Sequence, residues 1–287
     1  MQVAFIGFGL IAGSIARAVR ANPAANDWTM AAWSPSGEGP RQAAADGILD
    51  VAAVNPEDVL PGADLIILAG PATAVLADLD RLAGPWRPLV AAGAVITDVA
   101  STKGMLVARA DAAGLRFVGG HPMAGRETSG YGSADADLFV DRPWVVIPGA
   151  HAGAADVARV ASLAEACRAL VVEMDADAHD RAVAGISHLP LIVAAALVEA
   201  VAAKHDWPAA AALAAGGWRD TTRVARGDAT MGAAIAVTNA PALAARLHDL
   251  QAVLDGWLAE LERPDGPDET VIAERLTAAR ATLEALL

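Results

Sequence analysis

Residues 119–130 form the stretch GGHPMAGRETSG, which places one imidazole and one carboxylate among small residues and a proline. The side chains of His121 and Glu127 can each bind or release a proton. Glycine, proline and serine at this density favour turns over helices and strands, so we expect a shaped loop, and such loops tend to carry function. The simpler alternative is a glycine-rich turn whose histidine only caps a neighbouring group.

A second stretch has the spacing of a dinucleotide-binding turn. An apolar run at residues 3–8 leads into GFGLIAGS at residues 7–14 and then into a helical pattern. The first glycine allows a tight turn, the second lets backbone approach a pyrophosphate, and the alanine three residues later lets the helix pack on the strand. The helix N-terminus then faces the phosphates. The predicted cofactor-binding residues of this turn are Gly7, Gly9, Leu10, Ile11 and Ala12.

The end of the next apolar run, at residues 29–33, bears on the identity of the dinucleotide. Ser34 stands where Rossmann folds that prefer NAD usually carry an acidic residue for the ribose hydroxyls. Ser34 and Ser36, together with Arg41, can hold a 2′-phosphate. An ordinary Ser-Pro turn in an enzyme that uses NAD explains these residues equally well. The expected cofactor is therefore NADP or NAD.

Two further apolar runs, at residues 63–69 and 94–99, end in loops that carry polar groups. Continuous apolar runs are typical of parallel strands buried on both faces, and the carboxyl ends of such strands bind ligands. We therefore expect Pro71, after the first run, and Ser101, after the second, to lie at the cofactor. Alternatively, Ser101 serves only as a helix N-cap.

The elements that must position these groups alternate along the first half of the chain. Apolar runs separated by helical or loop segments predict an α/β fold with a doubly wound, mostly parallel, Rossmann-like sheet. We expect strands at residues 3–8, 29–33, 64–69, 94–99, 116–119, 144–147 and 170–174. Helices are expected at 177–204, 208–226, 229–235, 239–262 and 268–286. This division predicts a dinucleotide-binding domain at 1–175 and an all-α domain for substrate binding and dimerisation at 176–287.

Two features of the helical half can contact a substrate. Pro190 interrupts a helical pattern, which bends the helix and aims His188 into a cleft, although a lone histidine on an apolar face is usually a satisfied core residue. Arg219 and Arg223 lie four residues apart and suit a substrate with two carboxylates. The alternative is an exposed pair beside acids such as Asp220.

Composition narrows the class of partner. The chain has 287 residues, 55% of them hydrophobic, and a net charge of −13, which argues against nucleic acid and favours a small molecule. Its one cysteine, Cys167, allows no internal disulfide and no thiolate metal site, so we expect a buried thiol in a reducing compartment. No apolar stretch approaches the ~18 residues of a membrane span, and we expect a cytoplasmic protein without bound metal.

Taken together, these motifs resemble the prephenate/arogenate (cyclohexadienyl) dehydrogenase family over nearly the whole chain. The resemblance rests on residues 7–14, DVASTKG at 98–104, HPMAGRETSG at 121–130, SHLP at 187–190 and GWRDTTR at 217–223. It implies an enzyme of tyrosine biosynthesis that takes a hydride from C4 of a cyclohexadienol to NAD(P). The ring meanwhile loses carbon dioxide and becomes aromatic.

The resemblance also implies roles for individual residues. A neutral His121 accepts the proton of the C4 hydroxyl, and Ser101 hydrogen-bonds the same hydroxyl beside the nicotinamide. Arg223 clamps a substrate carboxylate and Arg219, where many relatives have lysine, supports or gates the site. Glu127 orients the loop, and His188 is expected to contact the substrate.

Two departures from the family pattern affect specificity. Ser34 replaces an acidic residue, and Leu191 replaces the second histidine of a Ser-His-x-Pro-His pattern. Both favour arogenate, or use of both substrates, and tolerance of NADP. The alternatives are another two-domain dehydrogenase of the hydroxyacid type, in which Lys204 is the only lysine available in the helical half, and a non-catalytic protein that senses dinucleotides. A homodimer through the C-terminal helices is expected.

Overall fold

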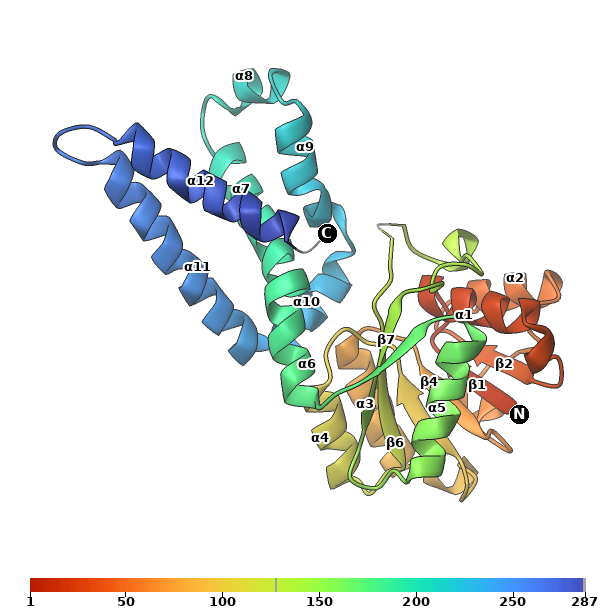
Figure 1. The fold of residues 1–287 in the computed structure, drawn as a ribbon. Coiled ribbons are helices and arrows are strands. Elements are labelled where there is room, and N and C mark those ends of the chain that lie inside the picture. Colours follow the sequence, from red (N-terminus) through yellow and green to blue (C-terminus); the bar gives the residue numbers. More distant parts are fainter. Residues whose placement is uncertain (127, 286–287) are drawn as a thin grey trace.

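The computed structural model describes residues 1–126 and 128–285 and has a sheet-containing half and a helical half (Figure 1). Eight strands form one sheet in the order β3-β2-β1-β4-β5-β6-β7-β8. Neighbouring strands are parallel except β6 and β7, which are antiparallel. The strands are β1 (Gln2–Ile6), β2 (Thr29–Trp33), β3 (Val51–Ala52), β4 (Leu65–Leu68), β5 (Val95–Asp98), β6 (Phe117–Pro122), β7 (Pro143–Pro148) and β8 (Leu170–Glu173).

This architecture confirms the predicted doubly wound, mostly parallel sheet followed by helices. Each of the seven predicted strands is present within a few residues of its expected bounds. The eighth, β3, was missed because its two residues, Val51 and Ala52, are too short to show any apolar alternation. It pairs with β2 at one edge of the sheet.

Helices cover both faces of the sheet and bury it completely in the middle. In β4, Leu65 and Ile67 belong to one core cluster, whereas Ile66 and Leu68 belong to the cluster on the other face. This is the period of two expected of a strand covered on both faces. Residues of α1 (Leu10–Ala21), α2 (Glu38–Ala45) and α5 (Ala154–Ala166) fill the first cluster; those of α3 (Ala72–Ala83) and α4 (Gly104–Ala112) fill the second.

The helical half begins at Ala176, three residues after the end of the last strand. Its helices are α6 (Ala176–Val183), α7 (Leu189–Ala202), α8 (Trp207–Ala212), α9 (Gly216–Thr222), α10 (Ala229–Thr238), α11 (Ala240–Leu261) and α12 (Glu269–Glu284). A π-helical segment, Ala184–His188, joins α6 to α7, and a 3₁₀ turn, Arg223–Arg226, follows α9. Pro190 lies in the first turn of α7, where its missing N–H costs little. The bend that the sequence predicts at Pro190 is thus replaced by the π-helical segment just before it, and His188 is the last residue of that segment.

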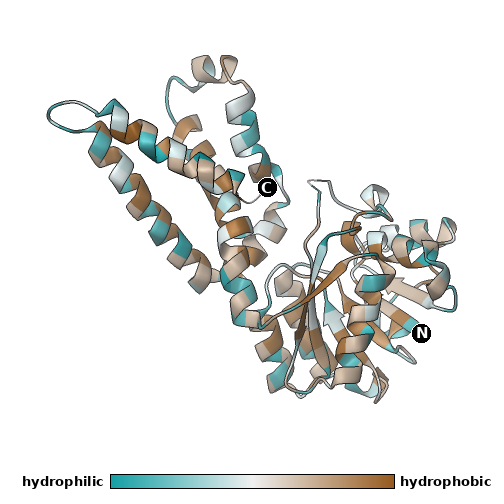
Figure 2. Cartoon of the chain, in the orientation of Figure 1, coloured by the Kyte–Doolittle hydropathy of each residue, from teal (hydrophilic) through white to brown (hydrophobic). Residues whose placement is uncertain are grey.

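The continuity of α6, the π segment and α7 corrects one expectation from the sequence. Residues Ala176–Ala202 form 27 residues of helix that are long and apolar enough to cross a membrane by length and composition. The expectation that no apolar stretch reaches that length is therefore wrong. Helices that pack against protein meet the same two criteria. The hydropathy colouring shows hydrophobic residues along this helix and along α11 (Figure 2). Ile186 of the π segment and Leu254 and Leu258 of α11 are exposed.

Candidate active site

The predicted dinucleotide turn has the backbone geometry that its glycines imply. Gly7 adopts φ +89°, and a Cβ there would lie 2.9 Å from the backbone of Ala69, so only glycine fits. Apart from its chain neighbours, no described residue lies within 4 Å of the position that a Cβ would occupy on Gly9, which leaves its backbone open to a ligand. Ala12 is buried where α1 packs on the sheet. Leu10 begins α1, whose N-terminus thus lies directly beyond the turn.

The other predicted cofactor residues surround this turn at the carboxyl edge of the sheet. The Gly7 N–H donates to the carbonyl of Trp33 at 2.8 Å, which places Ser34 beside the turn. Pro71 precedes α3 as its N-cap residue, two positions after Ala69. The residues fit a dinucleotide because an open backbone, a helix N-terminus and two strand ends converge at one place.

His121 lies in a strand, so the prediction of a loop for residues 119–130 is wrong for residues 119–122. It is the last residue but one of β6, and it pairs with Val145 of β7. A Cβ on Gly120 would lie 2.5 Å from the Asp98 carbonyl oxygen, so the missing side chain lets β6 and the end of β5 approach closely. Cross-strand pairing with a segment more than twenty residues away thus overrides the local preference for turns. Glu127, assigned to the same loop, lies outside the described residues.

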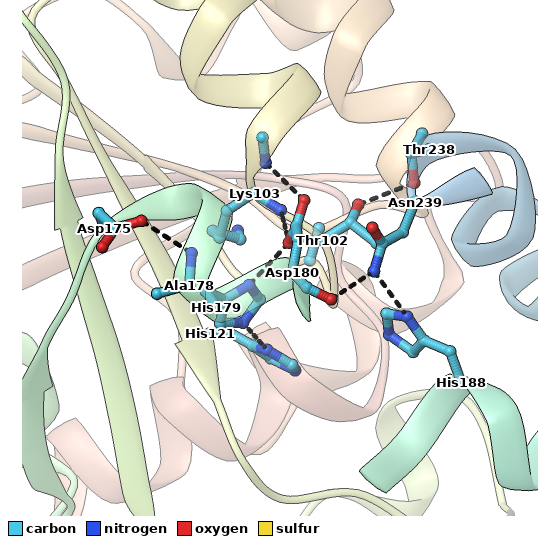
Figure 3. Close-up of polar contacts among 12 residues, drawn as sticks. Thr102, Lys103, His121, Asp175, Ala178, His179, Asp180, His188, Thr238 and Asn239 are labelled. Atoms are coloured by element: carbon cyan, nitrogen blue, oxygen red, sulfur yellow. Dashed lines mark hydrogen bonds and ion pairs between the residues drawn. The ribbon is translucent and has the colours of Figure 1, made fainter. Parts of the chain in front are cut away.

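His121 contacts a second histidine that sequence reasoning missed. Its Nδ1 lies 2.8 Å from Nε2 of His179, and Nδ1 of His179 lies 2.8 Å from a carboxylate oxygen of Asp180 (Figure 3). His121, His179 and Asp180 are all buried. His179 and Asp180 stand in α6, 58 and 59 residues after His121. In the sequence, only their adjacency near the start of the helical half could have indicated a role in the site.

His188 joins the same cluster from the π segment. It is 1% exposed, and its Nδ1 lies 3.1 Å from the amide nitrogen of Asn239, a residue that sequence reasoning also missed. Its Nε2 has no hydrogen-bond partner among the residues that the structure describes. Burial lowers the pKa of His188, while Asp180 and the backbone of Ser101 oppose that shift. Ser101 therefore lies at this cluster; it does not cap α4, whose N-cap residue is Lys103.

A buried ion pair holds the strand ends beneath His121. The Lys103 ammonium contacts the Asp98 carboxylate and donates to the Gly120 carbonyl oxygen at 2.7 Å. Burial lowers the pKa of Lys103 and raises that of Asp98, and their attraction opposes both shifts. Burial first, and then unfavourable electrostatic interactions with Lys103, His179 and His188, lower the pKa of His121 well below 6.5. His121 is therefore neutral at pH 7, as proton acceptance requires.

The two arginines predicted to bind substrate carboxylates stand at the end of α9. Arg219 lies within α9 and Arg223 begins the 3₁₀ turn that follows, and both side chains are exposed. Both arginines thus stand on one continuous segment, Arg219 on the helix and Arg223 on the turn that follows it. The described residues contain no group of three or more His, Cys, Asp and Glu arranged to hold a metal ion. Cys167 is buried as expected, and burial raises the pKa of its thiol.

Comparison with known proteins identifies the family. The family model described as prephenate dehydrogenase, nucleotide-binding domain, matches residues 15–173, and the model described as prephenate dehydrogenase, dimerization domain, matches residues 175–271. The chain belongs to the prephenate dehydrogenase family. It is thus an NAD(P)-dependent oxidoreductase whose reaction includes a decarboxylation. The alternative of a hydroxyacid-type dehydrogenase is excluded by this membership.

Individual members of the family differ in their named substrates. The chain is 33% identical to prephenate dehydrogenase of Bacillus subtilis, over 90% of this chain and 67% of that protein. It is 31% identical to cyclohexadienyl dehydrogenase of Zymomonas mobilis, over 91% and 86%. The crystal structure of Synechocystis arogenate dehydrogenase is 30% identical and superposes with a TM-score of 0.79, over 99% of this chain and all of that one. Prephenate and arogenate dehydrogenases are thus both among the relatives.

Proposed function

We propose that this prephenate dehydrogenase family member accepts arogenate as well as prephenate, with His121 as the general base. The observation that carries the base assignment is a buried His121, with a lowered pKa, at the carboxyl end of β6. Because β1, β4, β5 and β6 run parallel, this end lies at the same sheet edge as the dinucleotide turn. A substrate held there meets both the base and the nicotinamide. We also propose that the dinucleotide-binding domain comprises residues 1–175 and the helical domain residues 176–287.

The chemistry divides between the cofactor and the chain. When bound, NAD(P)⁺ supplies the hydride acceptor for the hydrogen on C4. His121 Nε2 takes the proton of the C4 hydroxyl as that hydride leaves, which avoids a build-up of positive charge on the ring. Loss of carbon dioxide then leaves its electron pair in the ring, and the phenolate oxygen recovers the proton from His121. No net proton is consumed.

Other residues of this chain hold the substrate in place for that transfer. Ser101, whose backbone lies at His188, orients the C4 hydroxyl. His188 directs its unpartnered Nε2 at a polar group of the substrate. Arg223, supported by Arg219, binds a carboxylate through the paired donors of a guanidinium group. Glu127 is assigned to orient the residues after β6.

The substrate proposal rests on Leu191, where relatives with a second histidine would present an imidazole. Leu191 is half-buried in the first turn of α7 and faces Gly232 of α10, so this position supplies no hydrogen bond to a keto side chain. Initial rates with prephenate or arogenate against NAD or NADP test it. Reduced cofactor should form with arogenate. Turnover of prephenate alone would contradict the proposal, and no reduced cofactor in any of the four mixtures would overturn the function itself.

The residues after β2 fit a 2′-phosphate, and we propose that NADP binds with them. Ser34 is 8% exposed, and its hydroxyl has no hydrogen-bond partner among the described residues. The following turn is closed by Gly37, whose N–H donates to the Ser34 carbonyl at 3.0 Å. The Arg41 guanidinium folds back onto this turn and donates to the Ser36 carbonyl at 3.3 Å. One cation and one unpaired hydroxyl thus lie beside the dinucleotide turn.

Substituting Ser34 by aspartate tests this cofactor proposal. A carboxylate about 4 Å from a 2′-phosphate should weaken NADP binding about 10-fold to 100-fold, because like charges repel at a partly buried site. NAD affinity should be unchanged or improved. Calorimetry with NADP⁺, NAD⁺ and 2′,5′-ADP measures this without turnover. The control Ala91→Asp adds the same charge before β5, at the opposite sheet edge. Equal losses for both dinucleotides would show that Ser34 does not face the phosphate.

We further propose a homodimer formed by the helical half, in the cytoplasm. The dimerization-domain match covers the residues that expose apolar side chains, which include Ile186 of the π segment and Leu254 and Leu258 of α11. A second copy of these helices would cover that surface, whereas a monomer leaves it in water. A mass measured by light scattering at micromolar concentration should equal two chains; a single chain would contradict the proposal. A buried, unpaired Cys167 suits a reducing compartment.

A further inference from the structure

We propose that two hydrogen-bond chains meeting at Asp180 hold His121 and His188 in opposite tautomers. The site then presents one imidazole nitrogen that accepts a proton and one that donates a hydrogen bond. His179, Asp180 and Asn239 are positioning residues in this arrangement, because they act through the two histidines. The inference rests on the proposed function, since it explains how His121 is prepared to act as a base.

The first hydrogen-bond chain starts from the Asp180 carboxylate, which acts as an acceptor. Oδ1 of Asp180 accepts the Lys103 N–H at 2.8 Å, and Oδ2 accepts the Gly104 N–H at 2.8 Å. These bonds, with His179, keep the pKa of Asp180 below its usual value, so the group is an acceptor. Nδ1 of His179, at 2.8 Å, must therefore carry the hydrogen. In a neutral His179, Nε2 is then an acceptor.

That acceptor decides the tautomer of the base. Nδ1 of His121 lies 2.8 Å from Nε2 of His179, so Nδ1 of His121 carries the hydrogen of its neutral ring. The lone pair is then left on Nε2. The arrangement follows the logic by which a carboxylate orients the histidine of a hydrolytic triad, with one more imidazole between them. After proton uptake, the positive charge on His121 is balanced by Asp180 across His179.

The second chain starts from a backbone carbonyl on the same residue. The Asp180 carbonyl oxygen can only accept, so the Asn239 side-chain atom that lies 2.8 Å from it is the amide nitrogen. The same nitrogen lies 3.1 Å from Nδ1 of His188 and donates its other hydrogen there. Nδ1 of neutral His188 is therefore an acceptor, and its hydrogen lies on Nε2. No hydrogen bond of ordinary distance and angle is made to that nitrogen by the described residues, although the Ser101 backbone interacts with the same ring, so the N–H can be offered to a substrate oxygen.

Asp180 links both chains and the two halves of the molecule (Figure 3). Its carboxylate binds the residues that begin α4, while its carbonyl binds Asn239 at the start of α11. Next to it, the hydroxyls of Thr102 and Thr238 lie 2.8 Å apart and join the same segments. The donor and the acceptor are thus fixed relative to one another by buried contacts that do not involve the substrate.

Nitrogen-15 NMR of the whole chain, with labelled histidine, reads the tautomers directly. The variants His121→Asn and His188→Asn assign the signals. At pH 7.5 we expect the hydrogen on Nδ1 in His121 and on Nε2 in His188. The same tautomer in both rings, or an imidazolium signal from His179, would overturn the inference. This NMR measurement needs no substrate, so its result is independent of whether the enzyme turns over prephenate or arogenate. The comparison of initial rates tests that proposed function separately.

Kinetics of His179 variants distinguish positioning from a merely structural role. His179→Leu removes the acceptor and should lower kcat about 100-fold with little change in KM. His179→Gln supplies a carbonyl oxygen to His121 Nδ1 and should restore at least about tenfold of that loss. His248→Leu replaces an exposed histidine of α11 and is the matched control. Equal kcat for the leucine and glutamine variants, at equal melting temperature, would contradict the inference.

Discussion

His121→Asn is expected to lower kcat about 10³-fold to 10⁴-fold while leaving the affinity for dinucleotide nearly unchanged. Asparagine retains a hydrogen-bonding side chain of similar reach, so the packing against β7 and His179 is disturbed little. It cannot accept a proton, and removal of a positioned general base costs up to about four orders of magnitude. Single-turnover formation of reduced cofactor measures the loss, and quenching of protein fluorescence measures dinucleotide binding.

The matched control for this substitution is His248→Asn. His248 is exposed on α11, and the same change there should leave kcat and KM as they are. If His121→Asn keeps a near-normal rate, His121 is not the base. If the rate falls only because dinucleotide no longer binds, His121 is a structural residue of the sheet edge.

The pH dependence of kcat/KM provides an independent check on the same residue. The base must be unprotonated to act, so activity falls as the pH drops through the pKa of His121. Burial, Lys103, His179 and His188 lower that pKa well below 6.5. The acidic limb of the profile should therefore lie below pH 6.5, and the rate should be flat between pH 6.5 and 8. A limb centred at or above pH 6.5 would mean that another group titrates or that His121 is solvated.

The local parts of this site could be read from the sequence, whereas the long-range parts could not. The dinucleotide turn was predicted because Gly7, Gly9 and Ala12 fulfil their roles within one strand-turn-helix unit. The position of His121 was misjudged because its backbone partners are in β7, and strand pairing depends on packing against neighbours. Glycines such as Gly120 favour a turn when the local sequence is considered alone, but here Gly120 allows β6 to approach the end of β5.

The positioning residues were missed for a related reason. His179, Asp180 and Asn239 give no local pattern beyond a polar pair in one helix and an N-cap before another. Their importance arises only when α6 and α11 pack beside the ends of β5 and β6, which brings together groups 58 to 118 positions from His121. Helical periodicity predicts which helices exist, but it does not specify which of their polar residues face a given strand.

Arg223→Ala should raise KM for prephenate or arogenate about 30-fold to 1,000-fold, with a much smaller change in kcat. The expected loss is about 2 to 4 kcal/mol, because truncation of the guanidinium leaves a substrate carboxylate without its charged donors. A clamp that binds substrate and transition state alike contributes to KM and not to kcat. Initial rates at saturating dinucleotide separate the two constants.

Arg226→Ala is the matched control, because Arg226 is an exposed arginine at the other end of the same 3₁₀ turn. Its removal alters net charge equally, so any difference between the variants reports position and not long-range attraction for an anionic substrate. Raising the ionic strength should weaken the long-range effect and leave the specific loss at Arg223. If both variants raise KM by the same factor, and salt removes that factor, the carboxylate is bound elsewhere and the arginines of this turn only attract the substrate.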